Sequence, residues 1–187
     1  CLECPTIRPG RRRYMKNINC IKGTFDILPE TSEIWREVES AVHDFMYVHG
    51  FGEIRTPAFE KTELFVRGIG DTTDIVNKEM YTWTDTDKAG TQLTLKPELT
   101  APVVRSYIQH NLAGKNPIHR LYYIDSLFRR ERPQKGRQRQ FNQFGVEAIG
   151  SPFPEQDAEV ISMAYQFFVS MGIEDLTVKK NGNGDGS

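Results

Sequence analysis

The stretch FRRERPQKGRQRQFNQFGVE, residues 128–147, decides the fold and holds the clearest candidate site. Six cations and one carboxylate lie within residues 129–139. The preceding residues, 121–128, are apolar and aromatic like a buried strand, whereas residues 140–149 alternate and predict a strand with Phe141, Gln143, Gly145 and Glu147 on one face. The basic run is therefore predicted to be a hairpin loop. Its return brings cations and carboxylates to one surface, which suits a nucleotide site whose ligand is anionic at one end and cationic at the other.

Length and composition exclude several classes of protein. The 187 residues suffice for one core of ordinary size, since domains usually run about 100 to 200 residues. The 24 Lys and Arg residues nearly balance the 25 Asp and Glu residues, so any anion site must be local rather than a global polybasic surface. No segment approaches the roughly 18 apolar residues of a membrane-spanning helix, and no signal-peptide core appears near the start. The sequence predicts a soluble protein with no membrane partner.

The cysteines and histidines indicate neither a metal site nor a covalent nucleophile. Cys1, Cys4 and Cys20 lie within the first twenty residues and are typical of cytosolic thiols. A tetrahedral zinc site needs four ligands, and no second Cys or His pair accompanies the first two cysteines. We therefore predict no metal held by the protein. The histidines are interpreted as structural or solvated; they are His43, His49, His110 and His119.

A long amphipathic helix and an edge strand are predicted to follow the N-terminal segment. Thr31 or Ser32 is the expected N-cap of the helix, and Gly50 is its expected stop. Residues 51–56 predict a strand, and Pro57 ends it because proline cannot donate a ladder hydrogen bond. The apolar stripe of the helix is expected to be Ile34, Val38, Ala41, Phe45 and Val48.

The middle of the chain predicts a second hairpin. Residues 58–65 are expected to form a short helix or turn, and residues 67–71 a loop whose glycines do not fit a phosphate-cradling pattern. Residues 79–84 and 92–95 are then expected to pair as antiparallel strands around a polar turn.

Two more helices complete the pattern. Thr100 is the expected cap of the first, which leaves Glu98 at a strand end, and residues 157–171 predict the second, with Gly172 as its stop and a new strand beginning at 176–178. Their apolar stripes are expected at Val104, Tyr107, Ile108 and Leu112, and at Val160, Ala164, Phe167 and Met171. Antiparallel pairs with unevenly placed helices indicate an α+β sheet with helices on one side, not a parallel Rossmann sheet.

Five segments in register resemble histidyl-tRNA synthetase, a class II aminoacyl-tRNA synthetase family. Residues 128–147 resemble class II motif 2, and FGEIRTPAFE, residues 51–60, resembles motif 1 with Pro57 as its proline. The other three are KGTFDILP (22–29), VNKEMYTW (76–83) and LKPELTAP (95–102). The first resembles the family's opening, and the other two resemble segments of the histidine-specific members of class II. The resemblance implies a class II antiparallel sheet flanked by helices, incomplete in this chain.

The resemblance assigns the basic hairpin to ATP. Arg129 is the expected catalytic residue, because a planar guanidinium can bind two oxygens of the α-phosphate and offset the charge that builds there. Glu131 would face the adenine end of the nucleotide or the tRNA terminus, and Arg137 would reach the γ-phosphate of a bent ATP. Phe141 would stack on the adenine ring, and Arg139 receives no role. Mg2+ would be bound through the ATP phosphates.

The resemblance also assigns a histidine pocket beside the nucleotide. Glu98, Thr100 and Gln143 would hold the ammonium group of L-histidine, and Glu147 would accept a hydrogen bond from the imidazole. An ammonium group and an N–H both need acceptors, which accounts for the acids in an otherwise basic pocket. A basic hairpin that binds only RNA would leave these acids unexplained.

The implied activity is that of histidine–tRNA ligase. Such an enzyme joins histidine to AMP with release of pyrophosphate and then transfers histidine to the 3′ end of tRNA(His). The resemblance further implies a cytoplasmic homodimer that associates through the motif 1 region. The alternative is a non-catalytic, synthetase-like histidine-binding subunit that regulates ATP phosphoribosyltransferase. A third possibility is that this chain is inert by itself.

The expected organisation has three parts. Residues 1–14 are predicted to be an upstream flexible segment, residues 15–178 a partial class II catalytic domain with motifs 1 and 2, and residues 179–187 a flexible tail. Class II motif 3, the histidine-specific Arg and Tyr segment and the anticodon-binding domain have no counterpart in the sequence. The opposite wall of the site is therefore expected from residues outside this chain.

Overall fold

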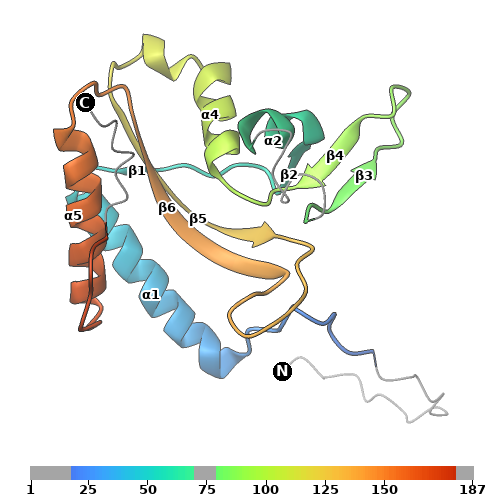
Figure 1. Cartoon of the computed structure of the whole chain (residues 1–187), viewed down its shortest axis with the longest axis horizontal. Coiled ribbons are helices and arrows are strands. Elements are labelled where there is room, and N and C mark those ends of the chain that lie inside the picture. Colours follow the sequence, from blue (N-terminus) through green and yellow to red (C-terminus); the bar gives the residue numbers. More distant parts are fainter. Residues whose placement is uncertain (1–17, 70–78, 180–187) are drawn as a thin grey trace, which may run out of the picture.

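The described part of the chain contains two small sheets, four α-helices and one 3-10 helix (Figure 1). The computed structural model describes residues 18–69 and 79–179; the predicted segment 1–14 and nearly all of the predicted tail 179–187 lie outside them. The elements in chain order are α1 (Pro29–Val48), β1 (Gly52–Glu53), β2 (Phe59–Lys61), α2 (Thr62–Ile69), β3 (Thr82–Thr84), β4 (Gln92–Leu95), α4 (Thr100–Gln109), the 3-10 helix η1 (Leu112–Gly114), β5 (His119–Phe128), β6 (Gln140–Ile149) and α5 (Glu155–Ser170).

The long β5–β6 ribbon is the centre of the first sheet, whose strand order is β1-β5-β6. The two strands pair antiparallel along their whole length, from His119 opposite Ile149 to Phe128 opposite Gln140. β1 pairs with β5 in the parallel sense through Gly52 and Glu53 only. The predicted hairpin is therefore confirmed, and its loop is the basic run 129–139.

One face of the ribbon packs against α1 and α5, which lie side by side across it (Figure 1). Phe167 of α5 lies at the centre of this contact, with its ring centroid 4.9 Å from that of Phe144 and 5.4 Å from that of Phe45. The buried members of this core are Val42, Met46, Phe51, Tyr122, Met163 and Phe167. Because side chains alternate along a strand, the neighbouring residues of β5 and β6 must point to the other face.

The opposite face of the ribbon, hereafter the site face, packs against the start of α4. Leu99 and Val103 are buried there against Tyr123 and Leu127 of β5. The second sheet, with order β2-β4-β3, is wholly antiparallel and lies beyond α4 together with α2 (Figure 1). The predicted pairing of residues 79–84 with 92–95 is confirmed by β3 and β4.

Several expected strands differ from the structure. The predicted strand 51–56 is only two residues long and parallel, because most of its backbone runs beyond the ribbon toward β2. Phe59–Lys61 is a strand paired with β4, not part of a short helix or turn. Arg67 belongs to α2 rather than to a loop. Residues 176–178 form no strand in the described part of the chain.

The predicted helix caps were also wrong. α1 begins at Pro29, which needs no partner for a backbone N–H and has φ already near the helical value. Thr31 and Ser32 instead donate side-chain hydrogen bonds to the carbonyls three residues back, at 3.0 and 2.9 Å. Thr100 is likewise the first residue of α4, and its hydroxyl is used elsewhere. The C-terminal stops at Gly50 and Gly172 are confirmed, with φ of +70° and +77°.

The buried helix faces are displaced from the predicted stripes. α1 buries Val42 and Met46, whereas Ile34 and Val48 are 60% and 78% exposed. α4 buries Pro102 and Val103, and α5 buries Met163 and Phe167. Of the residues in the predicted apolar stripes, only Phe167 is therefore fully buried. No helix in residues 18–69 or 79–179 combines the length and apolar character needed to cross a membrane.

Candidate functional site

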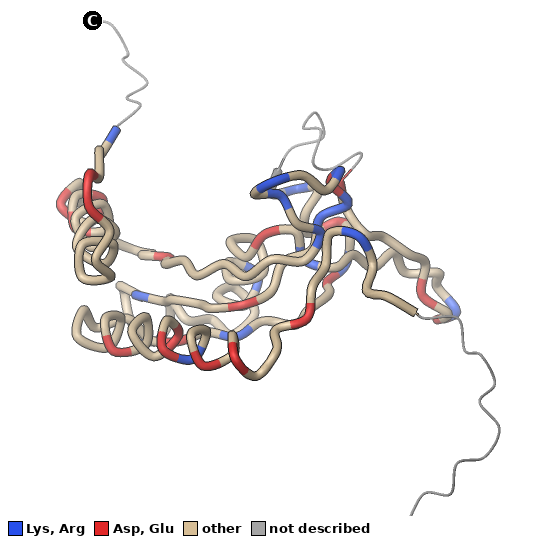
Figure 2. Tube along the Cα trace, turned by 90° about the horizontal axis from the view of Figure 1, so that it is seen from below, with Lys and Arg blue, Asp and Glu red and all other residues tan. Residues whose placement is uncertain are grey.

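A pocket of about 420 Å³ lies beside the basic hairpin loop. The blue segments of Figure 2 gather at this loop end of the ribbon, whereas α1 carries mostly red ones. All four residues assigned to ATP line the pocket. Its full lining is Glu79, Arg129, Glu131, Gly136, Arg137, Gln138 and Phe141.

Arg129 lines this pocket, and its side chain contacts the Pro97 carbonyl and the Phe141 ring. Its Nε donates a hydrogen bond to the Pro97 carbonyl at 3.0 Å, and its guanidinium carbon lies 5.0 Å from the centroid of the Phe141 ring. Nη1 is 3.7 Å from a carboxylate oxygen of Glu131, which is longer than a good charge-assisted hydrogen bond. The Nη groups therefore keep donors that an incoming phosphate can use.

Glu131 lies between two cations. Its second carboxylate oxygen is 3.7 Å from Nη1 of Arg137, so one acid balances Arg129 and Arg137 together. The loop is shaped by a tight turn in which the Arg137 N–H donates to the Gln134 carbonyl at 2.9 Å and Gly136 has φ of +79°. This turn returns Arg137 to the pocket, because the chain must reverse there.

Arg139, which received no predicted role, holds the loop in place. Its backbone N–H donates to the Gly23 carbonyl at 2.7 Å, and its carbonyl accepts from the Arg129 N–H at 2.9 Å. Its Nε points to the Glu131 carbonyl at 3.4 Å. A side chain at Gly23 would approach Pro133 and Arg139 within 3 Å, so the segment before α1 packs closely under the loop.

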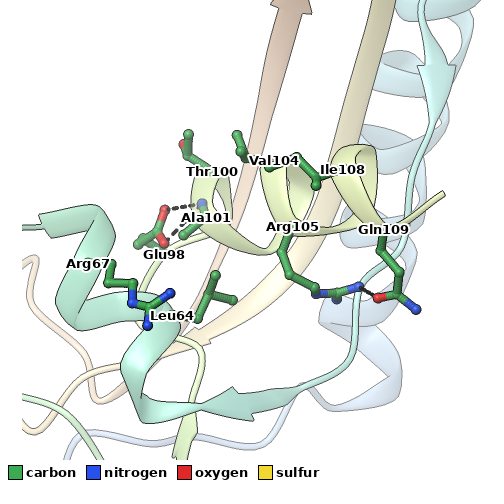
Figure 3. A pocket seen from close by; sticks show the side chains of 9 residues that line it. All are labelled: Leu64, Arg67, Glu98, Thr100, Ala101, Val104, Arg105, Ile108 and Gln109. Atoms are coloured by element: carbon green, nitrogen blue, oxygen red, sulfur yellow. Dashed lines mark hydrogen bonds between the residues drawn. The ribbon is translucent and has the colours of Figure 1, made fainter. Parts of the chain in front are cut away.

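The residues assigned to histidine gather at the other end of the site face. The Thr100 hydroxyl donates to Oε1 of Glu147 at 2.8 Å, and the Tyr123 hydroxyl points to the same oxygen at 3.3 Å. Both oxygens of Glu98 accept from the Ala101 N–H at the start of α4, at 3.1 and 3.2 Å, as the dashed lines of Figure 3 show. Three of the four predicted residues thus lie together around one small acidic surface.

Burial raises the pKa of two groups at this surface, Glu98 and Tyr123. Burial raises the pKa of Glu98, and the neighbouring Glu147 charge adds to the rise, although the Ala101 and Thr100 N–H groups and the Arg129 cation oppose it. Burial and the Glu147 carboxylate raise the pKa of Tyr123 to about 12, so its hydroxyl stays protonated and can donate. The Arg129 charge offsets only part of this rise, so an ammonium ligand beside the two carboxylates would stabilise their charged forms further.

Gln143 lies between the two groups of residues, on the same face of β6 and opposite Asp125 of β5. From Phe141 to Glu147 the strand advances six residues, which is about 20 Å at the usual rise per residue. Gly145 lies under Tyr123, since a Cβ there would come within 2.6 Å of the tyrosine oxygen. One strand therefore connects the phosphate end of the site to its acidic end.

A wider groove of about 630 Å³ continues from the acidic end along α4 (Figure 3). Beyond Glu98 and Thr100 its exposed wall is mainly apolar, from Leu64, Ala101, Val104 and Ile108, with Arg67, Arg105 and Gln109 also lining it. The convergent polar groups lie at the loop pocket and the acidic surface, so we place the site there rather than in the apolar part of the groove.

Sequence reasoning missed the polar residues beneath this surface. Lys96 and Asp125 form an ion pair, and Tyr123 supports Glu147. Alternation along 121–128 could have indicated Tyr123 and Asp125. They lie opposite Gly145 and Gln143 in the hairpin, and residues directly opposite each other share a face, which here is also the face of Glu147. Residues 18–69 and 79–179 contain no group of three or more His, Cys, Asp or Glu side chains arranged for a metal ion.

Comparison with known proteins identifies the family of the chain. Residues 23–180 match the family model described as histidyl-tRNA synthetase. A histidine–tRNA ligase of Chlorobium luteolum is 51% identical over 171 residues, which are 91% of this chain and 40% of that protein. One from Staphylococcus epidermidis is 53% identical over 165 residues, which are 88% of this chain and 38% of that protein. The chain thus spans about two-fifths of the length of these relatives.

Solved structures show the same fold. The structure of apo histidyl-tRNA synthetase from S. aureus superposes with a TM-score of 0.68 at 42% identity, covering 84% of this chain and 36% of that one. A Bacillus halodurans protein titled ATP phosphoribosyltransferase regulatory subunit/histidyl-tRNA synthetase gives 0.70 at 25% identity, covering 84% and 39%. The expected class II synthetase fold is confirmed, although helices pack on both faces of the ribbon and not on one side as predicted. The chain therefore belongs to the histidyl-tRNA synthetase family.

Proposed function

We propose that this chain supplies the ATP-binding wall and part of the histidine pocket of a histidine–tRNA ligase. The observation that carries the proposal is the arrangement along β6: a cation–aromatic pair at Phe141 and an acidic surface at Glu147 share one face, about 20 Å apart along the strand. A ligand with phosphates at one end and an ammonium group at the other matches both. The reaction would join L-histidine to AMP, release pyrophosphate and then esterify the 3′ end of tRNA(His).

The loop pocket would bind ATP by positioning and charge. Arg129 is oriented by Pro97, so its free donors can grip the α-phosphate and stabilise the charge that builds as the histidine carboxylate attacks. Arg137 would reach the γ-phosphate once it leaves Glu131, and Phe141 would stack on adenine. Glu131 would then be free to face the adenine or the tRNA terminus.

Mg2+ would enter with ATP rather than on a protein cage. The loop pocket offers only the carboxylates of Glu79 and Glu131, which fits an ion that keeps phosphate and water oxygens as its main ligands. When bound, the ion would neutralise phosphate charge during transfer. The residues of this chain orient the nucleotide around it.

The acidic surface would bind histidine. Glu98 and Gln143, together with the Thr100 hydroxyl, would hold the ammonium group, and Glu147 would accept from the imidazole N–H. The Thr100 and Tyr123 hydroxyls already fix Glu147 in place, so it needs little reorganisation when the ligand arrives. Two carboxylates and one cation make a better balanced site than two carboxylates alone.

The ligase is better supported than the regulatory subunit. A regulator needs a histidine pocket but has no use for residues that bind ATP, and Arg129, Arg137 and Phe141 all line one pocket here. The curated relatives near 50% identity are named histidine–tRNA ligase, whereas the structure whose title includes the regulatory subunit is 25% identical.

We further propose that the parent protein is a cytoplasmic homodimer that associates through the motif 1 region. β1 is an edge strand of the first sheet. Large apolar side chains on the adjoining helix are exposed, notably Tyr47 at 85% and Val48 at 78%. An exposed edge strand beside an apolar patch is a typical association surface.

The test is histidine-dependent exchange of labelled pyrophosphate into ATP. It is run on this chain and on a chimera in which residues 23–179 replace the matching segment of the Staphylococcus epidermidis relative. We expect exchange in the chimera, and a loss of about 100-fold or more when Arg129→Ala removes the phosphate donor. Arg132→Ala, an exposed cation of the same loop that does not line the pocket, is the matched control and should change the rate little.

The outcome is decisive in both directions. Histidine binding without exchange in the chimera, while the unmodified relative exchanges normally, would refute the ligase proposal and favour the regulatory role. Exchange by the chimera but not by the 187-residue chain would show that this chain is inert without the opposite wall.

A further inference from the structure

Lys96, immediately after β4, has only 1% of its surface exposed and is buried beneath the site face. A buried ammonium group is costly unless it is paired and hydrogen-bonded. Its Nζ forms an ion pair with Asp125 of β5 and a 3.3 Å hydrogen bond to the Thr56 carbonyl. The side chain therefore connects three separate segments: the end of β4, the ribbon and the strand exit after β1.

The backbone of Lys96 is fixed as well. Its N–H donates to the Ala58 carbonyl at 3.0 Å, and its carbonyl accepts from the Phe128 N–H at 3.0 Å. Phe128 is the last residue of β5, so this bond lies directly beside the start of the basic loop. Lys96 thus determines where the chain enters the next two residues, Pro97 and Glu98.

Those two residues each hold a member of the site. The Pro97 carbonyl accepts the 3.0 Å hydrogen bond from Nε of Arg129, and Glu98 caps the start of α4. Pro97 has no N–H of its own, so it cannot anchor itself to a strand. The position of the Pro97 carbonyl therefore depends on the residue before it, and the orientation of Arg129 depends on that carbonyl.

We propose that the Lys96–Asp125 ion pair is a positioning device that sets the guanidinium of Arg129 through the Pro97 carbonyl. A buried ion pair is weak evidence for stability, since an apolar pair of similar volume is often as stable. Packing alone therefore does not account for the two charges, whereas a role in positioning Arg129 does. A displacement of about 1 Å at a catalytic group can reduce a rate about 100-fold. The link to the phosphate rests on the proposed function, but the orientation of Arg129 does not.

The first test measures that orientation directly in the 187-residue chain. Hydrogen exchange of the Arg129 Nε–H is followed by arginine side-chain NMR, with Arg129→Lys to assign the resonance. We expect exchange at least about 10-fold faster in Lys96→Met and in the doubly neutral Lys96→Met/Asp125→Leu, and partial protection restored in Lys96→Arg. The exposed Lys61→Met is the matched control and should leave this proton unchanged.

The backbone amides of β5 and β6 are recorded in the same samples to show that the ribbon is intact. The double variant is included because Lys96→Met alone leaves the Asp125 carboxylate, whose side chain is 30% exposed, without its cation and can destabilise the fold by itself. An unchanged Arg129 Nε–H in a folded double variant would overturn the proposal.

The second test uses pyrophosphate exchange in the chimera. Lys96→Met/Asp125→Leu should lower kcat about 10- to 100-fold, yet cause no further loss when Arg129→Ala is already present. An equal loss in both backgrounds means that the pair acts without Arg129 and overturns the proposal. If the unmutated chimera does not exchange at all, the ligase proposal fails, and the NMR measurement still decides whether the pair positions Arg129.

Discussion

The two faces of the β5–β6 ribbon are built from alternate residues of the same strands, but different interactions stabilise them. Tyr122, Phe144 and Val146 point to α1 and α5 and are covered by apolar side chains. Tyr123, Asp125 and Glu147 point to the site face, where each has a polar partner. The helix-packed face is stabilised mainly by apolar burial, whereas the site face combines a smaller buried cluster with hydrogen-bonded and ion-paired charges. Substitutions on the two faces should therefore have different consequences.

The largest expected effect is on the helix-packed face. Phe167→Ala removes a buried ring that contacts Phe45 and Phe144, and should lower the free energy of unfolding by about 3–5 kcal/mol. Urea unfolding followed by circular dichroism measures the loss. Phe168→Ala, at a side chain 39% exposed, is the matched control and should cost much less. Equal losses at the two positions would mean that Phe167 is not the centre of this core.

The next effect is steric and lies on the site face. Gly145→Ala places a Cβ within 2.6 Å of the Tyr123 oxygen and forces the ring to move, which we expect to cost about 1–3 kcal/mol. It should also loosen Glu147, which loses the Tyr123 hydroxyl. The free energy of unfolding is compared with that of Gly52→Ala, where a Cβ would meet nothing closer than 3.9 Å. Equal changes in the free energy of unfolding for Gly145→Ala and Gly52→Ala would contradict the steric explanation.

A smaller effect is the pH dependence of the free energy of unfolding, which should have opposite signs for acids on the two faces. The pKa of Glu98 is raised above its ordinary value of 4.5, so the folded state binds more protons at this carboxyl than the unfolded state does. As pH rises through the interval between 4.5 and the raised pKa, ionisation of Glu98 therefore lowers the free energy of unfolding. The pKa of Glu159 on α5 is lowered, chiefly by its hydrogen bond from Arg120, so it stabilises above the ordinary value of 4.5 and loses that contribution as pH falls.

Replacing each acid by Gln should therefore give pH trends of opposite sign. Relative to the parent, Glu98→Gln should become more stable as pH rises from about 3 to 7, and Glu159→Gln less stable. Urea unfolding across this range, with both variants in the same buffers, checks the signs. Trends of the same sign would contradict the electrostatic difference between the faces.

The smallest effect on stability is expected on the outer surface of α1. Tyr47→Ser should change the free energy of unfolding by no more than about 0.5 kcal/mol, because the side chain is exposed. It should nevertheless weaken self-association if this patch belongs to the dimer surface. Sedimentation velocity measures association, and Ile161→Ser on α5 is the control for an exposed apolar residue elsewhere. Association that responds only to Ile161 would place the interface on the other helix.

The ribbon and the residues around its loop could be predicted from sequence because the signal is local. Alternation over ten residues fixes which side chains share a face, and a basic run between two strands has to be a loop. The placement of Phe141 and Glu147 on one face followed directly, and the structure confirms it. Their assigned ligands remain predictions.

The features that sequence could not give depend on distant partners. Helix α1 has more apolar positions than its neighbours cover, so periodicity alone could not choose Val42 over Val38 as its buried face. Phe59–Lys61 is a strand only because β4 is available to pair with it. Lys96 looks like a surface residue until Asp125 and Thr56 are brought beside it.

The separation of the fold into two sheets gives the chain two internal fluorescent reporters. Its only tryptophans are Trp35, on the helix α1, and Trp83, on β3 of the second sheet with its ring centroid 5.8 Å from that of Phe59. Each indole therefore reads a different half of the molecule. If single-tryptophan variants lose emission at the same urea concentration, the sheets form one cooperative unit, and the residues 96–98 that join them transmit stability as well as position.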